Sequence, residues 1–284
     1  MSNYDRELTV AEAAVSRAAA LCRSVRAEVS PDVLAKRDKS PVTVADFGSQ
    51  ALVARALREA FPADPLVAEE DAAELRAEGQ KPLLDSVVRH LRGHLGSDVD
   101  ADSALTWIDL GGAGTGSRFW TLDPIDGTKG FLRNEQYAVA LALLIDGRPQ
   151  VAALACPNLV VEGFSSPGAV FLAERGQGAR VRPLDGDAPA RTIHVRSLSD
   201  PSQARFCESV ESGHSDQGES ARIAAHLGLK AEPVRLDSQA KYGVVALGGA
   251  EIYLRLPTRA DYREKIWDHA AGLLVIEEAG GRVS

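Results

Sequence analysis

Cysteine is scarce in this chain of 284 residues, and the few cysteines present are not arranged for cross-linking or for zinc. Cys22, Cys156 and Cys207 lie far apart and form no Cys-x-x-Cys pair. Disulfide frameworks and zinc sites both depend on closely spaced, paired cysteines. The sequence therefore predicts neither, and a reducing compartment, the cytoplasm, is the expectation.

Long apolar runs are also missing, and the N-terminal stretch MSNYDRELTV has neither an apolar nor an arginine-rich leader character. A membrane span needs about 20 consecutive apolar residues, so we expect no membrane association. Positive charge is in deficit as well, because 32 Lys and Arg face 40 Asp and Glu, a formal charge of −8. Proteins that track a nucleic-acid backbone carry the opposite sign. We expect no nucleic-acid polymer as a partner, whereas a small anionic substrate is compatible with this charge.

The first part of the chain carries two hairpin patterns. Apolar runs at 138–145 and 149–155 meet at Asp146-Gly147, and a second pair of runs, at 169–173 and 179–183, surrounds two glycines. Apolar runs joined by such turn residues are typical of β-hairpins. Helical spacing of apolar residues also predicts a helix from Leu8 to Val29 and another over about 43–60. The first part is therefore predicted to be an antiparallel sheet with helices.

The stretch PLDGDAPA (183–190) is the best candidate boundary, since it combines two prolines, a glycine and two acids. After it, strand and helix patterns alternate, as is typical of an α/β unit. The expected elements are a strand near 204–210, a helix near 219–227, a helix near 238–248, a strand at 251–256 and a helix at 266–279. We therefore expect an α+β part over 1–188 and an α/β part over 189–284.

The stretch WTLDPIDGTKGF (120–131) sets Asp123 and Asp126 three residues apart around Pro124. The apolar run before them predicts a buried strand, and the proline excludes its simple continuation as a ladder or a helix. A turn at the carboxyl end of a strand directs both carboxylates and the Ile125 carbonyl into one small volume. Hard cations such as Mg²⁺ take oxygen ligands of these kinds, so the stretch predicts a metal site.

Gly127, Thr128 and Lys129 follow directly and are expected to open a helix, whose free backbone N–H groups attract an anion such as phosphate. Two alternatives remain open. Asp-Gly is common in turns for conformational reasons alone, which would leave two solvated carboxylates. Haloacid-dehalogenase-like phosphatases also place an acidic pair before Gly-Thr, but a single residue separates that pair. The two residues between Asp123 and Asp126 favour metal ligation by both carboxylates.

This motif resembles a signature of the inositol monophosphatase superfamily of metal-dependent phosphatases. Three further stretches agree with the resemblance, in the same order along the whole chain: SPVTVADFGSQ (40–50), VAEED (67–71) and KIWDHAAGLLVIEEAGG (265–281). The resemblance implies an α/β fold, a layered αβαβα sandwich of the inositol monophosphatase and fructose-1,6-bisphosphatase type. It places the active site between the two parts of the chain.

Within the superfamily the chain is most similar to the 3′(2′),5′-bisphosphate nucleotidases, which convert adenosine 3′,5′-bisphosphate to AMP. The stretches that carry this similarity are GFLRNEQYAVALALLIDG (130–147), CPNL (156–159), ESGHS (211–215) and LDSQAKYGVVALGGAEIYLRLP (236–257). A lysine at position 241 indicates that a second phosphate is held. The implied substrate is adenosine 3′,5′-bisphosphate, with its 5′-phosphosulfate as a further candidate, and inhibition by Li⁺ is expected. An inositol-phosphate or sugar-phosphate phosphatase and a non-catalytic binding module are the alternatives.

The resemblance also assigns roles to single residues. The implied ligands of two or more Mg²⁺ ions are Glu69, Asp123, the Ile125 carbonyl, Asp126 and Asp268. Asp46, hydrogen-bonded with the Thr128 hydroxyl, is expected to orient and deprotonate the attacking water. Gly127 and Thr128 are expected to bind the reacting phosphate. The residues implied to hold the 5′-phosphate and nucleoside are His214, Ser238, Lys241 and Arg255.

Several of these residues also have structural interpretations. Asp46 is expected in the first turn of a helix, where the helix dipole favours an acid in any case, and Asp268 could serve as a helix N-cap. His90 and His94 lack the glutamate of a metalloprotease motif and are read as a surface pair. The glycine-rich stretch 111–116 is read as a flexible connection. The superfamily continues past the last signature, so we expect a chain that ends at Ser284 to lack the final elements of a sheet.

Overall fold

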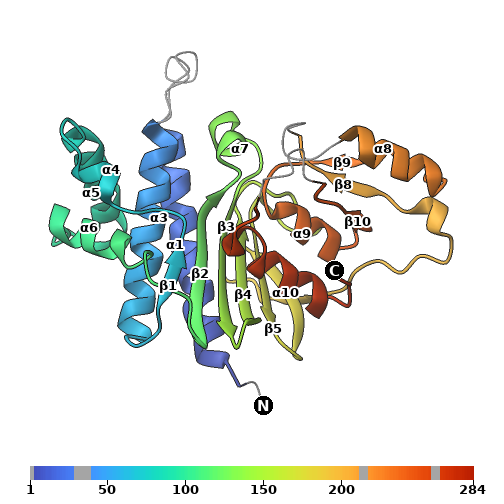
Figure 1. The fold of residues 1–284 in the computed structure, drawn as a ribbon, viewed down its shortest axis with the longest axis horizontal. Coiled ribbons are helices and arrows are strands. Elements are labelled where there is room, and N and C mark those ends of the chain that lie inside the picture. The colour runs from blue at the N-terminus through green and yellow to red at the C-terminus, as the bar shows by residue number, and fades with distance from the viewer. Residues whose placement is uncertain (1–2, 29–39, 211–216, 257–262) are drawn as a thin grey trace.

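The computed structural model describes residues 3–28, 40–210, 217–256 and 263–284. Figure 1 shows its layers edge-on: outer helices, a pair of long helices, a large central sheet, two further helices, and a small sheet with its own helix. This order confirms the α/β sandwich that the sequence predicts. In the described residues, no helix is both long enough and apolar enough to cross a membrane.

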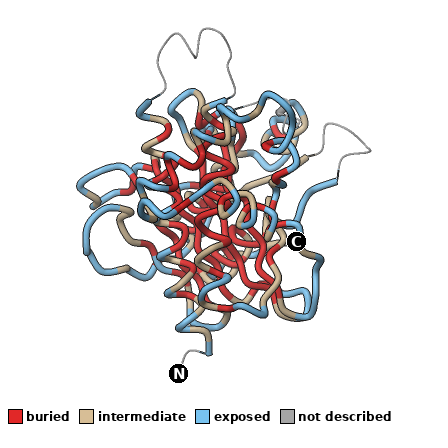
Figure 2. Tube along the Cα trace, turned by 90° about the vertical axis from the view of Figure 1, so that its left-hand side faces the viewer, coloured by how far each residue is buried: buried red, intermediate tan, exposed pale blue. Residues whose placement is uncertain are grey.

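The long helices α1 (Asp5–Ala27) and α3 (Ser40–Ala60) pack side by side on one face of the large sheet. Their apolar stripes are buried there, as the red stretches of Figure 2 show. Both predicted helices are confirmed, but α3 begins earlier than expected because Pro41 fits the first turn of a helix. Asp46 therefore lies in the second turn, and the dipole of the first turn does not explain it.

The large sheet has the order β1-β2-β3-β4-β5-β6-β7, antiparallel throughout except for the parallel pair β1 and β2. Its strands are β1 (Leu66–Ala68), β2 (Arg118–Asp126), β3 (Ala138–Ile145), β4 (Arg148–Cys156), β5 (Ala169–Glu174), β6 (Gly178–Pro183) and β7 (Arg191–Ile193). Both predicted hairpins are present. Asp146 and Gly147 have φ values of 49° and 74°, the left-handed pair that a tight hairpin turn requires.

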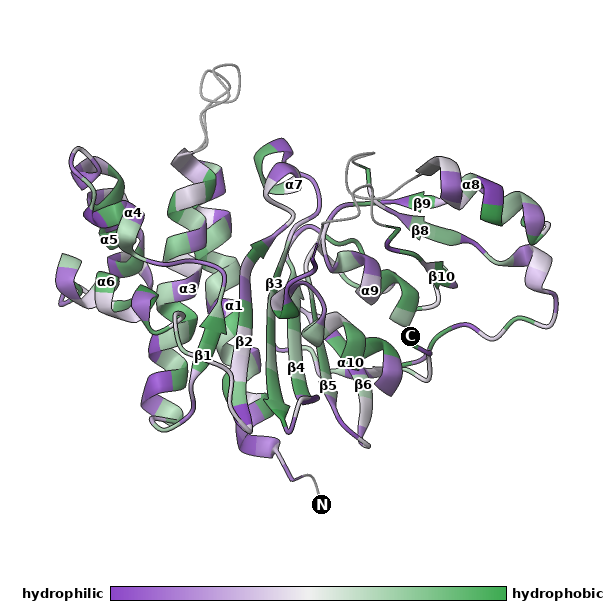
Figure 3. Cartoon of the chain, viewed as in Figure 1, coloured by the Kyte–Doolittle hydropathy of each residue, from purple (hydrophilic) through white to green (hydrophobic). Residues whose placement is uncertain are grey.

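Both faces of the central strands are buried, which explains their unbroken apolar runs (Figure 3). Along β3, Val139 and Leu141 join the core beneath α1 and α3, whereas Ala140 and Ala142 join a second core on the opposite face. That second face is covered by α9 (Ala240–Ala246) and α10 (Ala270–Glu278). Alternate residues of β3 thus pack against the helical layers on the two faces of the sheet.

The outer helices and the small sheet lie at the two ends of the molecule in Figure 1, and α7 lies between them. The outer helices are α4 (Ala73–Arg76), α5 (Lys81–Leu95) and α6 (Ala101–Asp109), and α7 (Thr128–Arg133) follows β2. The small sheet has the parallel order β10-β8-β9. Its strands are β8 (Phe206–Glu208), β9 (Val234–Arg235) and β10 (Ile252–Tyr253), and α8 (Gln217–His226) and the short helix η1 (Pro201–Gln203) belong to the same part of the chain. The short helix η2 (Ile266–Asp268) contacts β2 and β3 of the large sheet.

The alternating pattern expected after residue 188 is confirmed, with shorter strands than expected. The division at 188/189 stays a prediction, and α10 from the second part packs on β4 and β5 of the first. One expectation near the site is wrong in detail, because β2 continues past Pro124 to Asp126. The ladder to β3 pairs Asp123 with Ala140 and Asp126 with Ala138, so one extra residue on β2 forms a bulge there.

We expect Gly130→Ala to destabilise the protein by about 2 kcal/mol, since overpacking typically costs that much. A Cβ at this position in α7 would lie 2.0 Å from the Gln136 backbone oxygen, which cannot move without displacing the start of β3. Gly93→Ala is the matched control, because a Cβ there in α5 meets nothing within 4 Å. It should be neutral or stabilise by about 1 kcal/mol. Urea denaturation measures both variants, and equal effects would contradict the close approach.

Candidate active site

One polar face of α3 forms the base of the site. Asp46, Ser49 and Gln50 lie at i, i+3 and i+4, which places them on the same side of the helix, and all three are buried. Ser49 donates to the Pro124 carbonyl at 2.9 Å, between the two aspartates of the motif. Gln50 accepts from the Glu70 backbone N–H at 3.0 Å and donates to the Glu70 carbonyl at 2.6 Å. A single helix face thus carries one acid and fixes the backbone beside the others.

The predicted metal ligands come together around this face. Asp123 is buried, and Glu69 lies close enough for the two carboxyls to affect each other's pKa. Burial raises the pKa of Asp123 well above its usual range, and the charges of Asp126 and Glu69 raise it further. Partial desolvation and nearby acids likewise raise the pKa of Glu69 to about 7. These mutual effects show that the carboxylates share one small volume.

Asp46 and Asp268 belong to the same acidic group. Burial raises the pKa of Asp46 well above its usual range, with Glu70 and then Glu69 as the next causes. The charge of Asp268 acts on Glu69 and on Asp123. The structure therefore unites residues from α3, from β1 and its following loop, from β2 and from η2, although they span more than two hundred positions of the sequence.

The donor set of this group fits a hard divalent cation. Its side chains are carboxylates, and one oxygen of Asp123 is buried without a hydrogen-bond partner in the described residues. Buried, like-charged oxygens that raise one another's pKa are costly unless a cation neutralises them. Mg²⁺ prefers such ligands. Ile125 is buried beside them in the bulge of β2, while the ligand role of its carbonyl stays a prediction.

Gln239 connects the two parts of the chain at the site, and sequence analysis missed it. Its backbone N–H donates to the Asp126 carboxylate at 2.5 Å. Its buried side chain donates to the Trp267 carbonyl at 2.9 Å and accepts from the Gly272 N–H at 3.3 Å. Because Trp267 precedes Asp268, one residue holds β2, η2 and α10 together. The only signal in the sequence was the position of Gln239 between Ser238 and Lys241, which are both expected site residues.

Gly127 and Ser238 meet across the same seam. Gly127 has a φ of 89°, and a Cβ there would lie 2.8 Å from the Ser238 Cβ, so only glycine fits. Ser238 is buried with a φ of 68°. Thr128 opens α7 as expected, but it is exposed, and no hydrogen bond joins its hydroxyl to Asp46 among the described residues. That expected contact is not formed here, because α7 turns the Thr128 side chain towards solvent.

Lys241 and Arg255 are two cations whose charges act on the acidic group. Lys241 is buried, donates to the Leu236 carbonyl at 3.3 Å and lies 5.4 Å from the centre of the Tyr253 ring. The positive charges of both residues lower the pKa of Asp126, whereas burial raises it most. Both cations therefore lie close enough to Asp126 to act on its carboxylate. His214 lies outside the described residues.

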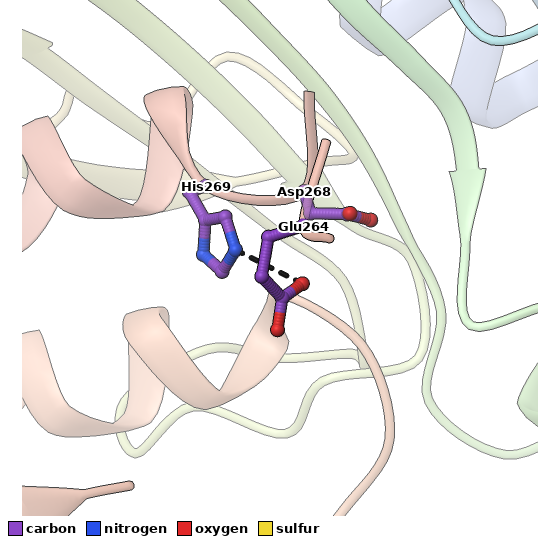
Figure 4. A group of neighbouring side chains, drawn as sticks. All are labelled: Glu264, Asp268 and His269. Carbon is purple, nitrogen blue, oxygen red and sulfur yellow. Dashed lines mark ion pairs between the residues drawn. The ribbon is translucent and has the colours of Figure 1, made fainter. Parts of the chain in front are cut away.

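Around Asp268 the side chains form a connected network (Figure 4). His269 Nε2 lies 3.1 Å from a Glu264 oxygen, and Tyr242 meets the other ring nitrogen at 2.7 Å. Glu264 also pairs with Arg255 at 2.7 Å. Asp268 accepts from the Lys265 N–H at 2.9 Å and so caps η2, while His269 takes the N-cap position of α10. Asp268 is therefore not the N-cap of the helix that follows, and that alternative is wrong. One carboxylate oxygen of Asp268 lies within 4.8 Å of the ligand atoms of Glu264 and His269 (Figure 4).

Two other interpretations change. His90 is buried between α1 and α5, with Nδ1 3.3 Å from the Ser24 hydroxyl, so it is not part of a surface pair. The glycine-rich stretch is not simply flexible, because the Gly111 carbonyl accepts from Ala68 at 2.9 Å. A Cβ on Gly111 would also lie 2.4 Å from the Gln50 amide nitrogen. The stretch packs against the base of the site.

Comparison with known proteins agrees with this architecture. A model of the inositol monophosphatase family matches residues 3–284. A 3′(2′),5′-bisphosphate nucleotidase of Emericella nidulans is 46% identical over 99% of this chain and 88% of its own length. A 3′(2′),5′-bisphosphate nucleotidase 1 of Arabidopsis thaliana is 45% identical over 98% and 84%. Among solved structures, Mycobacterium tuberculosis SuhB aligns with a TM-score of 0.65 at 24% identity, over 100% of this chain and 88% of that one.

The chain therefore belongs to the inositol monophosphatase family, whose enzymes are metal-dependent phosphatases. A bacterial member of the family, CysQ from Bacteroides thetaiotaomicron, shares the fold with a TM-score of 0.66 at 19% identity, over 98% of this chain and 88% of that one. The resemblance identified in the sequence is confirmed, both for the family and for its branch, because the full-length relatives above are bisphosphate nucleotidases.

We expect the metal-free protein to lose stability as pH rises. The folded pKa of Glu69, about 7, lies above its ordinary value of 4.5, so the folded state binds more protons between these values. Its contribution is present below about pH 4.5 and is lost as pH rises through about 7. Mg²⁺ should therefore stabilise the protein more at pH 8 than at pH 5.5. Urea denaturation with EDTA or Mg²⁺ measures this, and the difference between the two cancels groups remote from the site. An equal gain at both pH values would contradict the cluster.

We expect Gln239→Leu to weaken Mg²⁺ binding by about 10-fold to 100-fold, the usual effect of removing a group that orients metal ligands. The change keeps the volume but leaves the Trp267 carbonyl and Gly272 N–H unpaired. Gln150→Leu, at a surface amide of β4, is the control. Thermal denaturation against Mg²⁺ concentration gives the midpoint for each variant. An unchanged midpoint in Gln239→Leu would place Gln239 outside the metal site.

Proposed function

We propose that this protein is a Mg²⁺-dependent phosphomonoesterase that removes the 3′-phosphate of adenosine 3′,5′-bisphosphate and releases AMP and phosphate. The observation that carries the proposal is the buried acidic group with the cations Lys241 and Arg255 close enough to act on Asp126. A substrate with one phosphate at the reacting position and another some distance away matches that division of charge. The nucleotidase relatives along nearly the whole chain support the same substrate class.

In this proposal Glu69, Asp123, Asp126, Asp268 and the Ile125 carbonyl would hold two or more Mg²⁺ ions. When bound, such ions supply positive charge at the phosphoryl oxygens and lower the pKa of a coordinated water. The unpartnered oxygen of Asp123 supports its assignment as a ligand. The hydrogen bonds from Ser49 and Gln239 would keep the ligand-bearing backbone and the Asp126 carboxylate in place.

Asp46 is the proposed group that orients the attacking water and accepts its proton. Its buried position on α3 and raised pKa suit a group that must take up a proton. Thr128, at the start of α7, would have to turn inwards to reach Asp46. Gly127 and Thr128 are proposed to contact the reacting phosphate, since they immediately follow Asp126 in the closely packed seam against Ser238.

The far side of the site is proposed to hold the 5′-phosphate and the nucleoside. Lys241 and Arg255 would supply charge, Ser238 would supply its hydroxyl, and His214 is assigned by sequence similarity alone. Burial lowers the pKa of Lys241, whereas the charge of Asp126 opposes this effect. A buried ammonium with only the Leu236 carbonyl as its hydrogen-bond acceptor among the described residues is suited to a second anionic partner.

We expect Asp123→Asn or Asp126→Asn to abolish phosphate release from adenosine 3′,5′-bisphosphate, because each change removes a charged oxygen ligand without removing volume. Asp85→Asn, which breaks an exposed ion pair with Lys81, should leave the rate unchanged. The assay measures phosphate release from adenosine 3′,5′-bisphosphate, inositol monophosphate and fructose 1,6-bisphosphate, with Mg²⁺ or EDTA. Full turnover in EDTA would refute metal dependence. A preference for inositol monophosphate would favour the other branch of the family.

We expect Lys241→Met to lower kcat/KM for the bisphosphate by about 10-fold to 150-fold, the usual loss for one charged contact. Methionine keeps the apolar stem beside Tyr253 and removes only the charge. A 3′-monophosphate that lacks the 5′-phosphate should lose much less. Lys230→Met, at an exposed lysine, is the control. Equal losses on both substrates would place Lys241 outside the 5′-phosphate site.

A further inference from the structure

A second polar pocket lies apart from the acidic group, where the end of α1 meets the end of α7. Its volume is about 350 Å³, within the usual range for small-molecule sites. The lining residues are Arg23, Arg26, Ala27, Asn134, Tyr137 and Asn158. They come from α1, from the C-cap of α7, from the start of β3 and from the loop after β4. None of them is among the residues to which the proposed reaction assigns a role.

The two arginines of this pocket differ in how they are used. Arg23 is fully engaged, because it pairs with Asp185 at 2.7 Å and donates to the carbonyls of Pro157 and Pro167. Arg26 is anchored by one bond only, from Nε to the Phe131 carbonyl at 3.1 Å. Among the described residues, its two terminal nitrogens have no acceptor and no carboxylate pairs with it. The guanidinium is thus held in place with its strongest donor edge unused.

Tyr137 is the second unusual residue of this pocket. It is 1% exposed, and its hydroxyl has no hydrogen-bond partner among the described residues. Burial raises the pKa of Tyr137, so the hydroxyl stays a neutral donor, and the charges of Arg23 and Arg26 both act on it. A buried, unpaired hydroxyl costs about 1 to 3 kcal/mol in general. The cost is avoided if the pocket receives an acceptor.

Nearby carboxylates do not supply the missing acceptor for Arg26 and Tyr137. Asp185 pairs with Arg23, and Glu28, the C-cap residue of α1, pairs with Arg89 at 2.8 Å. Glu135, beside Asn134, pairs with Arg133 at 2.6 Å. Asn158 is fixed by a bond to the Glu135 carbonyl at 2.6 Å. The pocket therefore presents an uncompensated positive charge together with neutral donors in a fixed frame.

We infer that this pocket is a binding site for a tetrahedral oxyanion, either free phosphate or sulfate or the phosphate group of a nucleotide, held by Arg26 with Tyr137 and Asn134. An oxyanion accepts several hydrogen bonds and matches the planar donor edge of a guanidinium. The inference is independent of the proposed reaction. It adds a second anion site to the protein.

The test uses the 284-residue chain in EDTA, so that the acidic group repels anions. The binding that Arg26→Gln removes then reports the pocket, because this variant leaves Lys241 and Arg255 unchanged. Isothermal titration with sulfate should give saturable binding. Arg26→Gln should weaken it about 10-fold or more, and Tyr137→Phe, which keeps the ring against Phe131, by about 3-fold to 10-fold. Arg17→Gln is the matched control, because it removes the same charge from an exposed position of α1 and should have no effect.

Parallel titrations with inorganic phosphate and AMP distinguish the two sources of the anion. Tighter binding of AMP than of phosphate, lost in Arg26→Gln, would identify a nucleotide phosphate, and equal binding would identify the free anion. Absence of saturable binding, or equal affinities in Arg26→Gln, Tyr137→Phe and Arg17→Gln, would overturn the inference. If Arg26→Gln does not fold, the comparison of Tyr137→Phe with wild type decides alone.

Discussion

Mutual repulsion among buried carboxylates is the constraint on which the rest of this structure depends. Asp46, Asp123 and Asp126 are buried close to one another. Burial raises the pKa of each carboxyl, and the charges of neighbouring acids raise it further. Such a group opposes folding unless protons or cations are bound. The surrounding fold must therefore be stable enough to hold it. Two cores on the two faces of a large sheet supply that stability, because nearly every residue of β3 and β4 is buried.

The acids are held by a few buried amide and hydroxyl groups set into those cores. Ser49 and Gln50 reach from α3 to the backbone beside the metal-ligand candidates of β1 and β2, and Gln239 reaches from the second half to η2 and α10. The side chains of Ser49, Gln50 and Gln239 are each hydrogen-bonded, so they fix a direction without leaving an unpaired donor. These side chains thus position the acids mainly by hydrogen bonds to the backbone that carries them. The acids themselves remain free to meet a ligand.

Much of this could be predicted from the sequence, for physical reasons. Apolar runs joined at Asp146-Gly147 allow only a hairpin, and Pro124 between two aspartates forces an irregular strand end. The details that failed depend on tertiary contacts. Continuation of β2 to Asp126 depends on its pairing with Ala138. The early start of α3 is an exception, because it follows from Pro41 in the first turn, a local signal that the apolar period does not contain. Gln239 could not be recognised, because its partners lie about thirty residues further along the chain.

The division of charge across the site also gives the two halves of the chain separate tasks. The first half contributes most of the acids, whereas the second contributes Asp268, Lys241 and Arg255, with Glu264 bridging Arg255 to His269. Since α10 packs on the large sheet while η2 precedes it, the position of Asp268 is set by the core of the first half. Any shift of α10 on that sheet would therefore move a proposed metal ligand, and the Gln239 bonds would transmit the shift to Asp126. The acidic group is therefore complete only when α10 is packed on the large sheet in the second core.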